Sequence, residues 1–220
     1  MIILDDAYVS HRMQDYLQET QQPVLETEMA QNLQAQCQGA LNLVAPDEAA
    51  KRVEAGERLY AQSEAHLDWV VANVDKDRLH HAIDFCKDKA LMRSALASLY
   101  PDYFFKVVTA AELADMPFPQ EAAPVVLKPN VGFLSLGVYV CATEQNWTHA
   151  KAEVAAHLDE WSSWYKGSVI AADRFLVEGV IEGTEYAIDA YYDAKGEPQI
   201  MDILRHDFGG FGSLCDKGLA

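Results

Sequence analysis

Short apolar runs alternate with helical patterns over the first 73 residues, and this alternation is the feature that most restricts the fold. Strands are predicted at 1–4, 41–44 and 58–61, and helices at 7–19 and 63–73, with Ser63 as a helix cap and Pro46 as the start of another helix. The pair Val24–Leu25 is too short to predict a strand. Strands that alternate with helices form βαβ units around a mostly parallel sheet. We therefore predict a reduced, Rossmann-like α/β domain over residues 1–85.

A different pattern follows residue 85 and predicts a second domain over residues 86–220. Asp88 is placed to cap a helix with an apolar stripe that ends before Pro101. Strands are predicted at 103–108, 125–129, 138–141, 175–181, 185–192 and 199–205, with helices at 110–114 and 143–165. The turn at 193–196 joins the last two strands as a hairpin. This half is therefore expected to be an α+β domain with antiparallel strands.

The charge balance excludes two classes of partner. The chain has 34 Asp and Glu against 17 Lys and Arg, which gives a formal net charge of −17. A protein that binds nucleic acid or anionic lipid needs clustered positive charge, so we expect neither partner. The apolar runs are too short to span a membrane and the start does not resemble a signal peptide, so we expect a cytoplasmic protein. A small anionic ligand would need a local basic site.

Common catalytic signatures are missing from the sequence. It contains no GxxxxGK[ST] phosphate loop, no GxGxxG motif after a strand, and no HExxH metal motif. Ser135 lies among glycines, but Phe133 stands where a serine nucleophile elbow needs glycine. The sequence therefore points to no protein nucleophile.

The most informative segment runs from Pro124 to Val138. Lys128 ends an apolar strand, and the loop that follows contains Gly132, Ser135 and Gly137. Glycines let backbone N–H groups approach an anion closely, and a lysine at a strand end adds a point charge. The plain alternative is a lysine that extends to water beside a flexible hairpin. On this segment alone, the plain alternative is favoured.

Two glutamates and a second lysine shift that balance. Glu178 interrupts an apolar strand, and its burial is costly unless an adenine amino group or a lysine donates hydrogen bonds to it. Glu185 begins the next strand, where a carboxylate can accept bonds from two ribose hydroxyls. Lys89, early in a helix, is a further candidate phosphate contact. Alternatively, both glutamates lie on a solvated face, Gly183 is only a turn, and Lys89 is solvated.

Together and in this order, the motifs resemble those of the ATP-grasp superfamily. The matching residues are Asp88-Lys89-x3-Arg93, Val125 to Pro129 with the loop to Val138, and Val177-Glu178 with Glu185 seven residues later. The resemblance covers about residues 85–205. It implies a reduced pre-ATP-grasp domain followed by an incomplete ATP-grasp fold.

The resemblance also implies roles for individual residues. Lys89 and Lys128 would contact phosphate, and the loop with Gly132, Ser135 and Gly137 would cover it. Glu178 and the backbone of Gly179 and Val180 would contact adenine, and Glu185 would bind ribose. Lys128 and Arg205 are the predicted catalytic residues, with Arg205 facing a phosphate or a carboxylate substrate.

The implied reaction is the ATP-dependent ligation of a small carboxylate to an amine through an acyl phosphate, with ATP and Mg²⁺ as cofactors. One departure concerns the metal: no Glu-x-Asn motif follows Glu178, so we predict no metal ligand in this sequence. Either the chain is a piece of a longer enzyme, which the glycine-rich stretch at 209–213 favours, or it is a shortened relative. The alternatives are a non-catalytic nucleotide-binding or interaction module, and a plain α/β domain whose motifs are coincidental.

Overall fold

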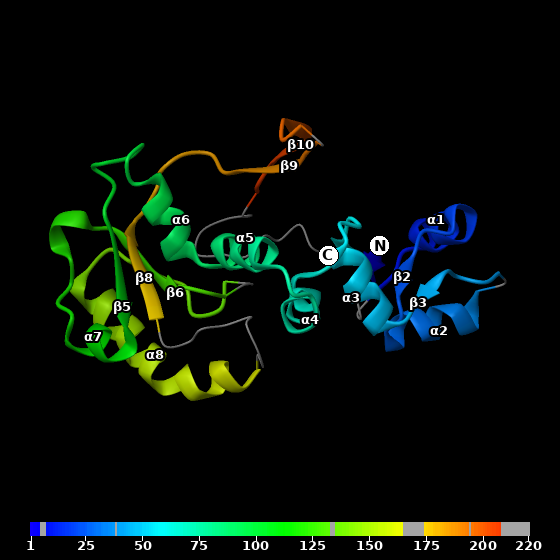
Figure 1. Ribbon diagram of the computed structural model, residues 1–220. Coiled ribbons are helices and arrows are strands. Elements are labelled where there is room, and N and C mark those ends of the chain that lie inside the picture. The colour runs from blue at the N-terminus through cyan, green and yellow to red at the C-terminus, as the bar shows by residue number, and fades with distance from the viewer. Residues whose placement is uncertain (5–7, 38, 133–134, 165–173, 194, 208–220) are drawn as a thin grey trace. The chain divides into compact units, whose positions relative to one another are not determined.

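The computed structural model describes residues 1–4, 8–37, 39–132, 135–164, 174–193 and 195–207 of the 220-residue chain (Figure 1). These residues form two compact units. The first contains Met1–Met92, and the second contains Arg93–Ser163 together with the described residues from Arg174 onward. This division falls inside a helix, and the domain boundary that the sequence predicts near residue 85 stays a prediction.

The first unit contains a parallel sheet, as the strand and helix alternation predicts. Its strands are β1 (Ile2–Ile3), β2 (Val24–Leu25), β3 (Leu43–Val44) and β4 (Tyr60–Ala61), in the order β3-β2-β1-β4. Every pair in this sheet is parallel. The sequence did not predict β2, because two residues carry no periodicity. Both of its side chains are buried, which is usual for a parallel strand covered on both faces.

Helices cover both faces of this parallel sheet. They are α1 (His11–Thr20), α2 (Glu28–Gln36), α3 (Pro46–Glu54), α4 (Leu67–Asn73) and α5 (Asp77–Lys87). Helix α6 (Lys89–Leu96) contains the division between the two units. Ile2 and Val24 belong to a cluster with α1 and α2, while Ile3 and Leu25 belong to another with α3, α4 and α5. Neighbouring residues of one strand therefore pack into the cores on opposite faces of the sheet, because side chains alternate along a strand.

Two local features of the first unit differ from the sequence-based expectation. Helix α2 was not predicted, although the Thr27 side chain accepts a bond from the Ala30 N–H at 3.2 Å and so caps the helix. Ser63 was expected to cap one helix as far as Asn73. Instead, a 3₁₀ turn at Glu64–His66 precedes α4, and Ser63 makes no side-chain cap bond.

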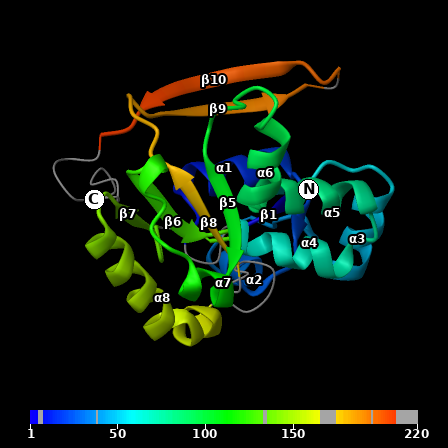
Figure 2. The ribbon, with the colours of Figure 1, turned by 90° about the vertical axis from the view of Figure 1, so that its left-hand side faces the viewer.

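The second unit is built on an antiparallel sheet, as predicted (Figure 2). Its strands are β5 (Phe105–Thr109), β6 (Val125–Pro129), β7 (Tyr139–Cys141) and β8 (Arg174–Gly179), in the order β5-β8-β6-β7. Helices α7 (Ala110–Asp115) and α8 (Glu144–Trp164) pack against it, and a 3₁₀ turn at Gln120–Ala122 precedes β6. Strands β9 (Tyr186–Tyr192) and β10 (Pro198–Arg205) form a separate antiparallel hairpin.

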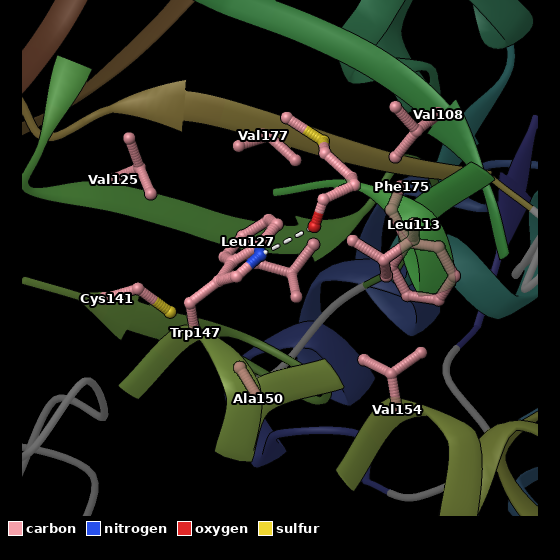
Figure 3. Close-up of a cluster of buried hydrophobic side chains, with 11 residues drawn as sticks. Val108, Leu113, Val125, Leu127, Cys141, Trp147, Ala150, Val154, Phe175 and Val177 are labelled. Atoms are coloured by element: carbon pink, nitrogen blue, oxygen red, sulfur yellow. Dashed lines mark hydrogen bonds between the residues drawn. The ribbon is translucent and has the colours of Figure 1, made fainter. Parts of the chain in front are cut away.

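One face of the sheet in the second unit supplies the core shown in Figure 3. Leu127 of β6 and Val177 of β8 point toward Trp147 of α8, whose indole N–H donates to the Met116 carbonyl at 3.1 Å. Because side chains alternate along a strand, Lys128 and Glu178 lie on the opposite face. The core therefore orients the two residues that the sequence analysis singled out.

None of the helices in the described ranges combines the length and the apolar character needed to cross a lipid bilayer.

We expect Leu127→Ala to lower the free energy of unfolding of the second unit by about 2–5 kcal/mol, because it leaves a cavity in a core that excludes water. Urea denaturation followed by circular dichroism would measure the change. The matched control is Val140→Ala on neighbouring β7, where the side chain is 45% exposed and the cost should stay below about 1 kcal/mol. Equal losses in the two variants would contradict this description of the core.

Candidate functional site

Lys128 and Glu178 form an ion pair across two neighbouring strands. In the antiparallel register, Lys128 lies opposite Leu176 and Val126 lies opposite Glu178, so the two charged residues are diagonal neighbours on one face. The Lys128 Nζ lies 2.5 Å from Glu178 Oε1. Only 5% of the Glu178 side chain is exposed, so the alternative that placed it on a solvated face is wrong. A lysine is indeed among the donors that its burial was expected to require.

A second cation, Arg93, contacts the other carboxylate oxygen. The Arg93 Nε donates to Glu178 Oε2 at 2.6 Å across 85 residues of sequence. Arg93 belongs to α6, whose start is capped by Asp88 as predicted, with the Leu91 N–H donating to Asp88 Oδ1 at 2.8 Å. The sequence analysis placed Arg93 in a motif but gave it no role. No local signal could have shown which carboxylate it meets.

Tyr103 connects Arg93 to the segment that follows Glu178. The Arg93 guanidinium carbon lies 4.9 Å from the centre of the Tyr103 ring, in the range of a cation–π contact. The Tyr103 hydroxyl donates to the Gly179 carbonyl at 2.7 Å. The N–H groups of Gly179 and Val180 donate to the Phe104 and Pro124 carbonyls. These bonds hold the backbone at Gly179 and Val180 in place.

The electrostatics of this group follow from burial and from the two cations. Burial by itself raises the pKa of Glu178, but hydrogen bonds from Arg93 and Lys128 outweigh it and hold that pKa below its usual 4.5. The hydrogen bond to Glu178 raises the pKa of Arg93. Burial, followed by the nearby Glu178 charge, raises the pKa of Tyr103 to about 12, so its hydroxyl stays protonated at neutral pH. The group therefore carries one net positive charge in a protein of formal charge −17.

A pocket of about 1110 Å³ lies beside this charged group. It is lined by Asp102, Tyr103, Phe104, Gly179, Val180 and residues 118–122. Tyr103 belongs to both features, since it lines the pocket and contacts Arg93. Aromatic rings beside backbone amide groups suit a flat ring with hydrogen-bonding edges. Gly179 and Val180 are thus at a pocket, and their predicted contact with adenine stays a prediction.

The predicted phosphate loop joins β6 to β7, and its residues 133 and 134 lie outside the described ranges. The Asn130 N–H donates to the Arg174 carbonyl at 2.9 Å, which ties the start of the loop to β8. Ser135 and Gly137 have φ values of 57° and 68°, in the left-handed region. Only glycine adopts that region without strain, so Gly137 suits its position better than Ser135 does. The contact of Gly132, Ser135 and Gly137 with phosphate stays a prediction.

Three other predicted site residues lie on α6 and beside or on the β9–β10 hairpin. Glu185 is 60% exposed, and its Oε1 lies 2.7 Å from His206 Nδ1, which ties the start of β9 to the residue after β10. Arg205 is exposed at the end of β10, opposite Tyr186 in the hairpin. Lys89 begins α6 and belongs to the first unit. Their roles with ribose, substrate and phosphate stay predictions.

Among the residues that the structure describes, no group of three His, Cys, Asp or Glu side chains is placed to hold a metal ion.

Comparison with known proteins gives both a domain family and a fold. Residues 121–217 match the family model of the ATP-grasp domain. No curated protein matches the chain. An L-amino acid ligase from Bacillus licheniformis is 15% identical with a TM-score of 0.57, and the match covers 97% of this chain and 51% of that one.

Two further solved structures share this fold. An N5-carboxyaminoimidazole synthase from Aspergillus clavatus, in complex with ADP and 5-aminoimidazole ribonucleotide, is 14% identical with a TM-score of 0.56, over 97% of this chain and 54% of that one. The ADP complex of PurK, an N5-carboxyaminoimidazole ribonucleotide synthetase, is 13% identical with a TM-score of 0.52, over 84% of this chain and 47% of that one.

The chain spans about half the length of these structures. The family match falls on the unit that carries the Lys128–Glu178 pair, and the structural matches extend over most of the chain. Residues 121–217 therefore resemble an ATP-grasp domain, in agreement with the order of the sequence motifs, and the structural matches show a shared fold.

Proposed function

We propose that this protein binds ATP at the second unit and takes part in joining a small carboxylate to an amine through an acyl phosphate. The observation that carries the proposal is the buried Glu178 carboxylate, bonded to Lys128 and Arg93 beside the pocket at Gly179 and Val180. The family match and the ADP held by two of the similar structures support a nucleotide as the ligand.

In this proposal, the charged group binds the phosphates of the nucleotide and the pocket binds its base. Phosphate oxygens are attracted to the net positive group, where the Lys128 side chain is 21% exposed and so accessible from solvent. The flat base enters the pocket lined by Phe104 and Phe118 and meets the backbone at Val180. The loop between β6 and β7 follows Lys128 directly and supplies backbone N–H groups for the phosphates.

The proposed chemistry needs no protein nucleophile. A carboxylate oxygen of the substrate attacks the γ-phosphorus, the bond to the ADP oxygen breaks, and ADP leaves. The amine nitrogen then attacks the carbonyl carbon of the acyl phosphate, phosphate leaves with the electrons of the broken C–O bond, and the nitrogen loses a proton. Lys128 offsets the charge that accumulates on the transferred group. When bound with ATP, Mg²⁺ would offset charge on the phosphates.

A second candidate function is nucleotide binding without catalysis. The observation that raises it is that no cluster of three His, Cys, Asp or Glu side chains able to hold a metal ion is found among the described residues. The two candidates share the ATP site and differ only in turnover, so binding and turnover need separate experiments.

The binding experiment is a thermal unfolding series with ATP. At a concentration 100 times the Kd, ATP should stabilise the native state by about 2.7 kcal/mol. Lys128→Ala should weaken ATP binding by about 1.5–3 kcal/mol, because it removes a charge-assisted contact to phosphate. Lys106→Ala is the matched control: Lys106 is exposed on β5 and lies opposite Val177, on the other face of the same sheet. Unchanged binding in Lys128→Ala would refute the site.

The turnover experiment uses carboxylates labelled with ¹⁸O in both oxygens, mixed with a pool of amines. Ligation through an acyl phosphate should move one ¹⁸O into the released phosphate, because the attacking oxygen leaves with phosphorus. ADP release that depends on both substrates would accompany it. Mass spectrometry of the phosphate measures the label. ATP binding without any labelled phosphate would support the non-catalytic candidate, and release of AMP would exclude the acyl-phosphate route.

A further inference from the structure

We propose that Arg93 is a positioning residue, which keeps the Glu178 carboxylate compensated so that Lys128 can turn from Glu178 to the phosphates of a nucleotide. This inference rests on the proposed function, because it assigns a task to Arg93 in nucleotide binding. In this inference, Arg93 keeps its bond to Glu178 when the nucleotide binds, and Lys128 leaves Glu178.

Both carboxylate oxygens of Glu178 have a cationic partner. Lys128 contacts Oε1 and Arg93 contacts Oε2, so each cation has an oxygen of its own. If one cation leaves, the other bond need not change. A buried carboxylate with a single counter-ion could not release that counter-ion so easily, because an uncompensated buried charge is strongly unfavourable.

The side chains of Arg93 and Lys128 are held differently. Arg93 has a planar guanidinium that lies over the Tyr103 ring, and Tyr103 is itself anchored to the Gly179 carbonyl. Lys128 has a flexible four-carbon side chain, and the only hydrogen-bonding or ionic partner recorded for its ammonium among the described residues is Glu178. Arg93 is therefore expected to keep its position, and Lys128 is expected to change its partner.

Few titratable groups face Glu178 among the described residues. Arg93 of α6, Lys128 of β6 and the Tyr103 hydroxyl are the titratable groups recorded in contact with it among the described residues, and Tyr103 stays neutral at ordinary pH. On β5, the residue opposite Glu178 is Phe105, and Lys106 lies on the other face. Arg93 is thus the one permanent cation left for Glu178 when Lys128 turns away.

The test compares ATP affinity between about pH 6 and pH 8 in the wild type and in Arg93→Gln. In the variant, Lys128 can leave only if Glu178 takes up a proton, so affinity relative to wild type should fall by up to about tenfold for each pH unit of increase. The ratio between the two proteins cancels the titration of the nucleotide itself. Isothermal titration calorimetry in buffers of different ionisation enthalpy would also measure the proton uptake directly.

Three further variants make this result specific. Arg93→Lys restores the charge and should restore most of the wild-type profile. Adding Glu178→Gln to Arg93→Gln removes the titrating carboxylate and should abolish the slope, while Lys106→Gln should not change it. A folded Arg93→Gln protein whose affinity keeps a constant ratio to wild type at every pH would overturn the inference.

A measurement on the unmodified protein decides the question if Arg93→Gln does not fold. The ¹³C resonance of the Glu178 carboxyl carbon should report an ionised group at neutral pH with ATP bound. Protonation of Glu178 when ATP binds at neutral pH would overturn the inference and leave the ATP site intact. Failure of the wild type to bind ATP would overturn both proposals, and the Lys128→Ala experiment separates the two cases.

Discussion

The burial of one carboxylate, Glu178, is the constraint on which the site depends. A charged group at the end of an apolar strand destabilises the fold unless donors reach both of its oxygens. Lys128 comes from the neighbouring strand and Arg93 from a helix 85 residues earlier. The carboxylate therefore links α6, β6 and β8, which are far apart in the sequence. Any change in its charge is felt by all three elements.

Two cations around one anion also make the net charge of the site positive. With a single counter-ion the group would be neutral, but Arg93 and Lys128 together leave one net positive charge. That charge is local, because the protein as a whole is strongly acidic. A phosphate group would be attracted there because Glu178 holds Arg93 and Lys128 close to one another.

The backbone beside the carboxylate is held as firmly as the side chains. Tyr103 bonds to the Gly179 carbonyl, and the N–H groups of Gly179 and Val180 already have partners in the chain. A base that enters the neighbouring pocket therefore meets a rigid edge. The resemblance to ATP-grasp proteins implied that Gly179 and Val180 would contact adenine. Both of their backbone N–H groups already donate within the chain, and the Gly179 carbonyl accepts from Tyr103, so fewer backbone groups remain for a contact with adenine.

Local pattern was enough for much of this molecule. Strand β6 begins and ends where the sequence predicts, and the change from a parallel to an antiparallel sheet was also readable, because alternation with helices or with turns is a local property. Strand β2 and helix α2 were missed, since β2 is two residues long and the sequence analysis did not recognise Thr27 as a helix cap. The cost of burying Glu178 could also be inferred from its apolar neighbours.

The sequence by itself determined that Glu178 needs donors and that a lysine could be one of them. Only the tertiary structure decided that Arg93 is the other, that Tyr103 contacts Arg93, and that Glu185 contacts His206. The physical reason is range. Strand and helix periodicity, caps and turns depend on residues a few positions apart, whereas an ion pair across 85 residues depends on how separate elements pack.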